Sequence, residues 1–331
     1  PRSVVKLICC LLFLCRVQGE YFQALRQRKS SEDDILEPIW KHILTMSATS
    51  DERGLATPMF WHIHKSGGTT VQDVIGSCLN LTVASHIGVD NGHGEDQILG
   101  FSYVYGAHYL NVDTTSENGI QRAHAMGFHT KHKLVQLVLS PLIIPATKLL
   151  FSEESKGSIF TFFRHPVERA ASLFYYLQNA TWEPTFDNRW ASMTLLEYAQ
   201  SYFAERNWMV QMLVGKTAEM LNEHDLEEAK KILRNKIWVG LQNRMHDSFV
   251  RFGAIYGWDQ NPNWEVCLKE VQEGKWMSNK NQNKPVLTRE SEAWDVLAQI
   301  NHLDMKLFHF AESLFDQQGE LVHSILQSGT I

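Results

Sequence analysis

The sequence predicts an α/β protein whose parallel β-sheet is flanked by helices on both faces. Short apolar runs alternate with stretches of helical spacing between residues 57 and 252. Such alternation is typical of parallel sheets whose strands are joined by helices. The 331 residues, of which 44% are hydrophobic, also suffice to bury one large core.

Residues 1–20 predict a secretory signal peptide or a truncated type II membrane anchor. Residues 4–15 are apolar apart from Lys6, and Arg2 precedes them. The run is shorter than the roughly 20 apolar residues that span a bilayer, but a basic start and a short apolar core are typical of a signal peptide. We therefore expect the protein in the Golgi lumen or membrane, or secreted if the leader is cleaved. Residues 21–56 are charged and predict a stem or irregular leader, followed by one domain over 57–331.

Within that domain, four apolar runs predict strands, and each is followed by a predicted helix. The strands are expected at 58–63, 134–139, 158–163 and 236–240. The helices are expected at 69–78, 168–177 and 243–252, with one more, after the second strand, that ends at 150. Apolar spacing over 291–318 predicts one or two further long helices. Cys78 and Cys267 lie outside the leader, and the sequence leaves open whether they form a disulfide or stay as buried thiols.

The first motif is the turn after the first strand, with the residues Lys65, Ser66, Gly67, Gly68, Thr69 and Thr70. Glycines let the backbone turn tightly, and the N–H groups of the turn and the helix start favour a bound phosphate or sulfate. Because Lys65 precedes the glycines, the order differs from the nucleotide-binding pattern G-x-x-x-x-G-K-[ST]. An ordinary strand-to-helix turn with an exposed lysine is the alternative.

The second motif runs from Phe162 to Tyr176 and places Arg164 where the third strand ends. Open α/β sheets bind ligands at the carboxyl ends of their strands, and a guanidinium offers a planar fork of donors to phosphate oxygens. Ser172 follows inside the next helix. By itself, Arg164 fits better as an arginine that caps backbone carbonyls.

Together, the two motifs resemble those of the membrane-anchored carbohydrate sulfotransferases, especially the heparan sulfate 2-O and 6-O branch. Residues 60–70 look like the 5′-phosphosulfate loop of that family and residues 162–176 like its 3′-phosphate loop. Weaker similarity lies at 207–213, 238–242 and 301–307. The resemblance implies a P-loop-type, three-layer α/β/α catalytic domain over 57–331. It also implies the donor 3′-phosphoadenosine 5′-phosphosulfate (PAPS), the product 3′-phosphoadenosine 5′-phosphate (PAP), and no metal.

The resemblance also implies roles for single residues. Lys65 would stabilise the charge that grows on the bridging oxygen as the S–O bond breaks. The residues Ser66, Gly67, Gly68, Thr69 and Thr70 would hold the 5′-phosphate, and Arg164 and Ser172 would bind the 3′-phosphate.

The acceptor hydroxyl needs a general base, and the family uses a His or a Glu. His108 loosely resembles the setting of that base in the 2-O branch and is the first candidate. The alternatives are Glu95, Asp96, His129 and His132.

The acceptor is expected to be a glycan, and an anionic one if the basic stretch from Arg122 to Lys133 contacts it. That stretch carries Arg122, His124, His129, Lys131, His132 and Lys133 and no acidic residue, and a solvated basic loop is the equal alternative. The net charge of −6 argues against a nucleic-acid partner, because such binding needs clustered cations.

Three classes of function therefore remain. The first is transfer of a sulfuryl group from PAPS to a glycan hydroxyl. The second is a P-loop kinase or other phosphotransferase, and the third is a lumenal glycan-binding protein of the same fold without turnover. A requirement for Mg²⁺ would favour the second class, and absence of donor hydrolysis or transfer would favour the third.

Overall fold

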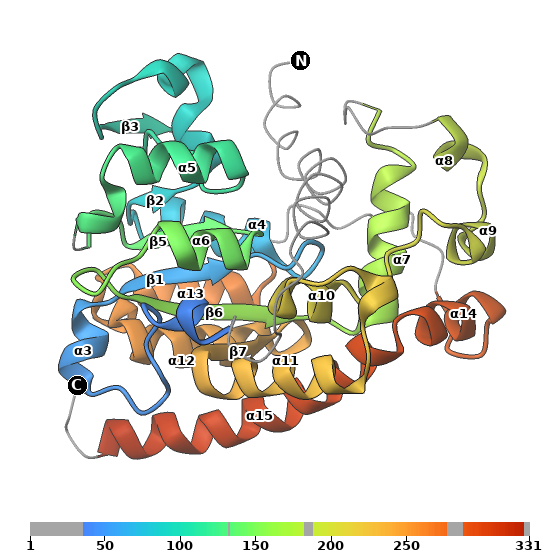
Figure 1. The fold of residues 1–331 in the computed structure, drawn as a ribbon. Coiled ribbons are helices and arrows are strands. Elements are labelled where there is room, and N and C mark those ends of the chain that lie inside the picture. Colours follow the sequence, from blue (N-terminus) through green and yellow to red (C-terminus); the bar gives the residue numbers. More distant parts are fainter. Residues whose placement is uncertain (1–35, 132, 182–187, 277–286, 328–331) are drawn as a thin grey trace.

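The computed structural model describes residues 36–131, 133–181, 188–276 and 287–327, and its centre is a seven-stranded sheet (Figure 1). The strand order is β3-β4-β2-β5-β1-β6-β7. The β3–β4 pair is antiparallel and the other pairs are parallel. The strands are β1 Thr57–Trp61, β2 Val83–Ala84, β3 Phe101–Val104, β4 Ala107–Leu110, β5 Leu137–Ser140, β6 Gly157–Phe163 and β7 Ile237–Leu241. The predicted α/β class and the mostly parallel sheet are confirmed.

Side chains alternate between two cores, one on each face of the sheet. Phe60, Phe160 and Phe162 point into one core. Met59, Trp61 and Ile159 point into the other. All residues of β1 and β6 are buried, as expected for parallel strands that are covered on both faces.

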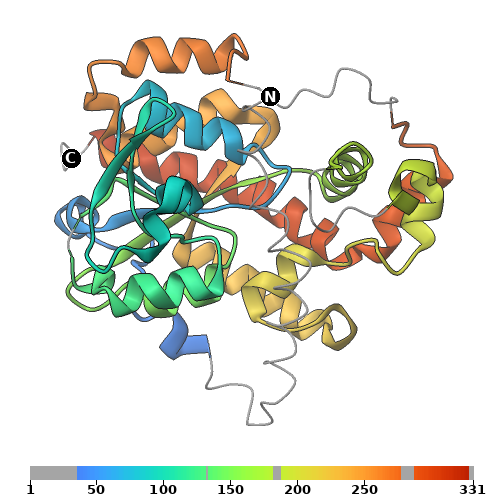
Figure 2. The same cartoon turned by 90° about the horizontal axis from the view of Figure 1, so that it is seen from above.

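Helices cover both faces of the sheet (Figures 1 and 2). The first core contains α4 Gly68–Gln72, which continues as the π-helical turn η3 Asp73–Cys78, together with α12 Met245–Tyr256 and α13 Trp264–Gln272. The second contains α2 Leu36–Trp40, α5 Glu117–Ala125, α6 Ile143–Leu149, α10 Trp208–Val214, α11 Glu223–Lys236 and α15 His302–Gln327. Shorter turns are α3 Ser50–Leu55, η4 His86–Glu95, η5 Phe128–Thr130, η6 Ala218–Met220, η7 Gln242–Arg244 and η8 Trp258–Gln260.

A helical lobe lies beside the sheet and has a third core of its own (Figure 1). It consists of α7 Pro166–Leu177, α8 Asn188–Ser192, α9 Leu195–Gln200 and α14 Glu292–Ile300. Pro166 occupies the first turn of α7, where its missing N–H costs nothing. Since α14 and α15 are separate helices, the long apolar stretch near the end of the sequence forms two helices.

The part of the predicted stem that the structure describes is packed on the domain, so the expectation of an irregular leader is corrected for residues 36–56. Ile39, Trp40 and Ile43 are buried in the core, and Ile43 forms a bridge with Gly157. Apolar residues at positions 36, 39, 40, 43 and 44 recur at helical spacing, a local signal that the charged composition of 21–56 as a whole concealed. The expected signal or anchor at 1–20 lies outside the described residues. In the part of the chain that is described, no helix has the length and apolarity needed to cross a membrane.

A disulfide joins Cys78 and Cys267, whose Cα atoms are 5.8 Å apart. It resolves the alternative that the sequence left open. The bond ties the end of η3 to α13, so the helical segment that follows the first motif is linked covalently to the covering helix layer.

Candidate functional site

The first motif forms a tight loop between β1 and α4 at the carboxyl ends of the strands. Lys65 and Gly67 both have left-handed backbones, with φ of 63° and 101°. This conformation is easy for glycine and costly for lysine. Ser66 is fully buried, and its Oγ has no hydrogen-bond partner among the described residues. A strained loop with free buried hydrogen-bonding capacity is typical of a functional site.

The second motif lies against this loop because β6 pairs directly with β1. Arg164 Nη1 donates a hydrogen bond to the carbonyl oxygen of Lys65 at 3.1 Å. The Lys65 ammonium lies 4.3 Å from the ring centroid of Tyr176, on α7. Two motifs that are a hundred residues apart in the sequence therefore meet at one lysine.

The other residues expected at the donor site lie on the two helices that follow the motif loops, α4 and α7. Gly68 starts α4 and lies so close to His62 that a β-carbon there would be 2.0 Å from the imidazole Nε2. Thr69 is on the same helix, and the hydroxyl of Thr70 donates to the carbonyl of Trp276 at 3.1 Å. Ser172 is buried in α7, two turns after Arg164.

A buried charged network behind the loop escaped the sequence analysis. One carboxylate oxygen of Glu205 lies 2.9 Å from His64 Nε2 and 2.7 Å from Arg169 Nη1. Arg169 is fully buried, and its Nε and Nη2 have no hydrogen-bond partner within the described residues. Burial would raise the pKa of Glu205, but His64 and Arg169 outweigh it and lower the pKa to about 2. Glu205 is therefore ionised at neutral pH.

Two further features of the sequence could have pointed to this network. His64 stands directly before Lys65, and Arg169 is the second arginine of the second motif. Glu205, however, comes from the segment after α9, where nothing in the local pattern marks it. A nearby histidine, His62, is held neutral because burial lowers its pKa to about 3.

The two weaker stretches of family resemblance, 207–213 and 301–307, are in contact. The Asn207 backbone N–H donates to the Asn301 side chain, and the Leu303 N–H donates to the Asn207 side chain, both at 2.9 Å. Asp304 accepts from the N–H groups of Met209 and Val210, at the start of α10. These contacts cap a helix and hold α10 to α15, so their role here is structural.

His108, the first candidate for the base, is not brought near Lys65. The strand register puts Tyr109 level with Val83, Leu137 and Pro58, so that His108 is level with Thr57, the first residue of β1. At about 4.8 Å per strand and 3.3 Å per residue, three strand spacings and four residues separate it from the end of β1, roughly 14 Å across and 13 Å along the sheet. The exposed ring of His108 instead packs near Tyr103, at 5.0 Å.

Of the alternative bases, Asp96 lies at the carboxyl ends of the strands. Its Oδ2 is 2.9 Å from Nδ1 of His93 and 3.2 Å from Nδ2 of Asn111, which directly follows β4. Glu95 is an exposed neighbour at the end of η4. His129 stacks on His124, and Nδ1 of His124 contacts the carbonyl of Leu149. Leu149 is the last residue of α6, the helix that follows β5. His132 lies outside the described residues.

The basic stretch is partly committed to internal contacts. The Arg122 guanidinium donates to the carbonyls of Asn111, His93 and Asp96. Lys131 and Lys133 are exposed. Arg122 therefore anchors the loop that carries His93 and Asp96, and the stretch is not one continuous cationic surface.

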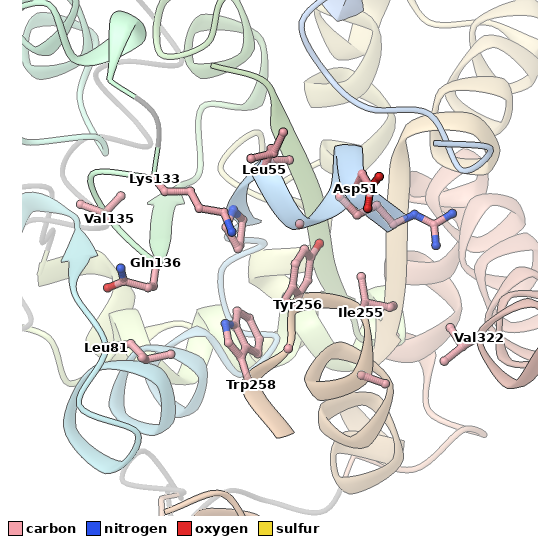
Figure 3. Close-up of a pocket in the computed structure, with 16 residues that line it drawn as sticks. Asp51, Leu55, Leu81, Lys133, Val135, Gln136, Ile255, Tyr256, Trp258 and Val322 are labelled. Carbon is pink, nitrogen blue, oxygen red and sulfur yellow. The ribbon is translucent and has the colours of Figure 1, made fainter. Parts of the chain in front are cut away.

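A cavity of about 1070 Å³ lies at the opposite edge of the sheet, where the strands begin (Figure 3). Its lining includes Pro58 of β1, Leu81 before β2 and Gln136 before β5. Tyr256 and Trp258 form one wall, with Lys133 across from them in Figure 3. The cavity is mainly apolar and shares no residue with either motif. We therefore place the candidate site at the carboxyl edge, where open α/β sheets bind their ligands.

A scan against protein-family models finds no match, and a search of the curated proteins finds no similar sequence. Function must therefore be argued from the site itself. The two loops present one ammonium, one guanidinium and a set of turn N–H groups, and this combination is suited to an anion with two separated phosphate-like groups.

Proposed function

We propose that this protein is a sulfotransferase that moves a sulfuryl group from PAPS to a hydroxyl group of a glycan. The observation that carries the proposal is the adjacency of the two motifs, because β6 pairs with β1 and brings Arg164 against the loop of Lys65. The bond from Arg164 to the Lys65 carbonyl is by itself also what a carbonyl-capping arginine forms. A donor with both a 5′-phosphosulfate and a 3′-phosphate needs binding groups on two adjacent loops.

In this proposal, the P-loop-type turn from Ser66 to Thr70 holds the 5′-phosphate and Lys65 acts on the bridging oxygen. Charge develops on that oxygen as the S–O bond breaks, so a cation there stabilises the transition state more than the ground state. Arg164 and Ser172 bind the 3′-phosphate. Within this proposal, a transferring sulfuryl group carries less negative charge than a phosphoryl group, and these residues suffice without Mg²⁺.

The disulfide supports a place in the secretory pathway, as a Golgi enzyme or a secreted one. Disulfides form and persist in oxidising compartments and are rare in the cytosol. The Cys78–Cys267 bond lies at the far end of the helical segment that begins at Gly68 of the first motif. A glycan acceptor belongs to the same compartment.

For the acceptor base, we propose the His93–Asp96 pair in place of His108. Asp96 faces Nδ1 of His93 and thereby leaves Nε2 as the atom that would accept the proton of the acceptor hydroxyl. The pair lies beyond the carboxyl end of β4, on the same edge of the sheet as Lys65 and three strand spacings, roughly 14 Å, from β1. Loss of transfer in His93→Ala, with unchanged PAP affinity, is the expected result.

A second candidate function is a glycan-binding protein of the same fold that lacks turnover. The observation that favours it is the distance of His108 from Lys65, because a site without a base would bind the donor and transfer nothing. It predicts PAP binding without transfer or donor hydrolysis.

The deciding experiment is calorimetry of the purified lumenal region with PAP and with ATP, without metal and with Mg²⁺. We expect metal-independent binding that prefers PAP and is lost in Arg164→Ala. Arg234→Ala is the matched control, because Arg234 is exposed in the last turn of α11, close to the residue where β7 begins and so at the opposite edge of the sheet. A preference for Mg-ATP would instead support a phosphotransferase, and absence of nucleotide binding would overturn both readings.

A further inference from the structure

We propose that Glu205 is a positioning residue for Lys65 and acts through His64 and Arg169. This inference rests on the proposed function, in which Lys65 stabilises the leaving oxygen of the donor. It adds a residue that belongs to neither motif.

The first step concerns the backbone. Lys65 has a φ of 63°, a conformation that is strained for a residue with a side chain and that persists when its surroundings fix it. The contacts around it supply that fixation. Arg164 holds the carbonyl of Lys65 on one side, and His64 precedes it on the other.

The second step concerns His64, whose ring is almost completely buried. Trp208 packs edge-on against the ring at 4.5 Å between centroids, and Glu205 lies 2.9 Å from Nε2. The same Glu205 oxygen accepts from Arg169 at 2.7 Å. Since Arg169 belongs to α7, one carboxylate ties the first loop to the helix that follows the second loop.

The third step concerns the direction in which the Lys65 side chain points. Lys65 points its ammonium toward Tyr176, which is also on α7 and two turns after Arg169. Glu205 therefore fixes both ends of this arrangement, the loop through His64 and the helix through Arg169. Arg169 Nη1 also lies 2.6 Å from His64 Nε2, so His64 keeps one partner when Glu205 is changed. A neutral side chain at position 205 would leave the guanidinium buried without its anion and let the contact between Arg169 and His64 rearrange, so that the aim of Lys65 would change.

Donor affinity and turnover should respond differently. The phosphates are held by loop N–H groups, Arg164 and Ser172, whereas Lys65 acts mainly in the transition state. In Glu205→Gln we expect kcat to fall at least about tenfold while the Kd for PAP changes less than about threefold. In the Lys65→Ala background, the same substitution should lower kcat no further, because its effect passes through Lys65.

Asp225→Asn is the matched control, since Asp225 is a buried carboxylate that pairs with Lys216 at 2.9 Å away from the two loops. It should lower stability and leave the ratio of kcat to Kd unchanged. Glu205→Asp, which keeps the charge and shortens the side chain, serves if Glu205→Gln does not fold. An equal loss of kcat with and without Lys65, or a loss of PAP affinity that matches the loss of kcat, would overturn the inference.

A measurement without turnover separates this inference from the proposed function. Lysines are labelled by reductive ¹³C-methylation, and the Lys65 signal is assigned by its absence in Lys65→Arg. We expect this signal to shift in Glu205→Asp and to stay in place in Asp225→Asn, whether or not PAP binds. A Lys65 signal that does not move would refute the positioning role. A wild-type protein that binds no PAP would refute the proposed function alone.

Discussion

The two halves of the sheet differ in how their loops are held. In the half formed by β1, β6 and β7, strands of five to seven residues are fully buried, and their loops are joined by Arg164, Glu205 and Arg169. In the half formed by β2, β4 and β3, β2 has two residues, and Phe101 and Tyr103 of the edge strand are exposed. In the first half, contacts between the loops hold the cations in place, whereas the second half presents exposed side chains at its edge strand. A transferase needs the first property for its donor and the second for a large acceptor.

Substitution of Lys65 tests the first half most directly. In Lys65→Ala, transfer from PAPS should fall about 10²- to 10³-fold, the usual cost of removing one group that stabilises developing charge. PAP affinity should change little. The measurement is single-turnover transfer with labelled PAPS, with Lys231→Ala as the control at an exposed lysine. Equal transfer by both variants would contradict the role of Lys65.

The pH dependence of stability tests whether Glu205 ties this half together. The pKa of Glu205 is lowered to about 2 in the folded protein from its ordinary value of 4.5. The stabilisation is therefore complete above about pH 4.5 and is lost as the pH falls toward 2, with a total of about 3 kcal/mol.

Urea denaturation should show that the difference in unfolding free energy between wild type and Glu205→Gln shrinks as the pH falls from 5 toward 2. Asp96→Asn provides the comparison in the other half, because Asp96 also has a lowered pKa but its side chain is partly open to solvent. A pH-independent difference for Glu205 would show that its charge does not hold the network.

The sequence could predict the first half because its signals are local. The runs 58–63 and 158–163 coincide closely with β1 and β6, and the glycines and Arg164 follow directly at the strand ends. The contact between the two motifs follows from the adjacency of those two strands. Nothing local could reveal Glu205, because its partners are distant in the sequence and meet it through the fold of the helical lobe.

The second half was predicted poorly for the same physical reason. β2 has only two residues, and β3 and β4 mix exposed with buried residues where β5, of equal length, is fully buried, so their places depend on pairing across the sheet. His108 looked like a site residue because it lies between the motifs in sequence. Its distance from Lys65 is set by strand register, which a single sequence does not display.

Substitution of Gly68 should have a smaller effect than loss of Lys65, and it tests the packing of the first loop. A β-carbon at Gly68 would lie 2.0 Å from His62 Nε2, so Gly68→Ala should cost about 1 to 3 kcal/mol through overpacking. Adding His62→Ala should restore most of that loss. Gly54→Ala is the control, since nothing lies within 4 Å of a β-carbon there. Thermal unfolding of the four proteins, together with PAP titration, measures the outcome.

The smallest effect is expected at His108, and this prediction tests the contrast between the two halves of the sheet. Because His108 is exposed and level with the start of β1, His108→Ala should leave transfer and PAP affinity unchanged within the error of the assay. His93→Ala should abolish most transfer, since it removes the atom that would take the proton. His108→Ala could instead reduce transfer as much as we expect for His93→Ala. The acceptor hydroxyl would then have to be activated from the edge of the sheet where β1 begins. The division between a donor half and an acceptor surface at one edge would then be wrong.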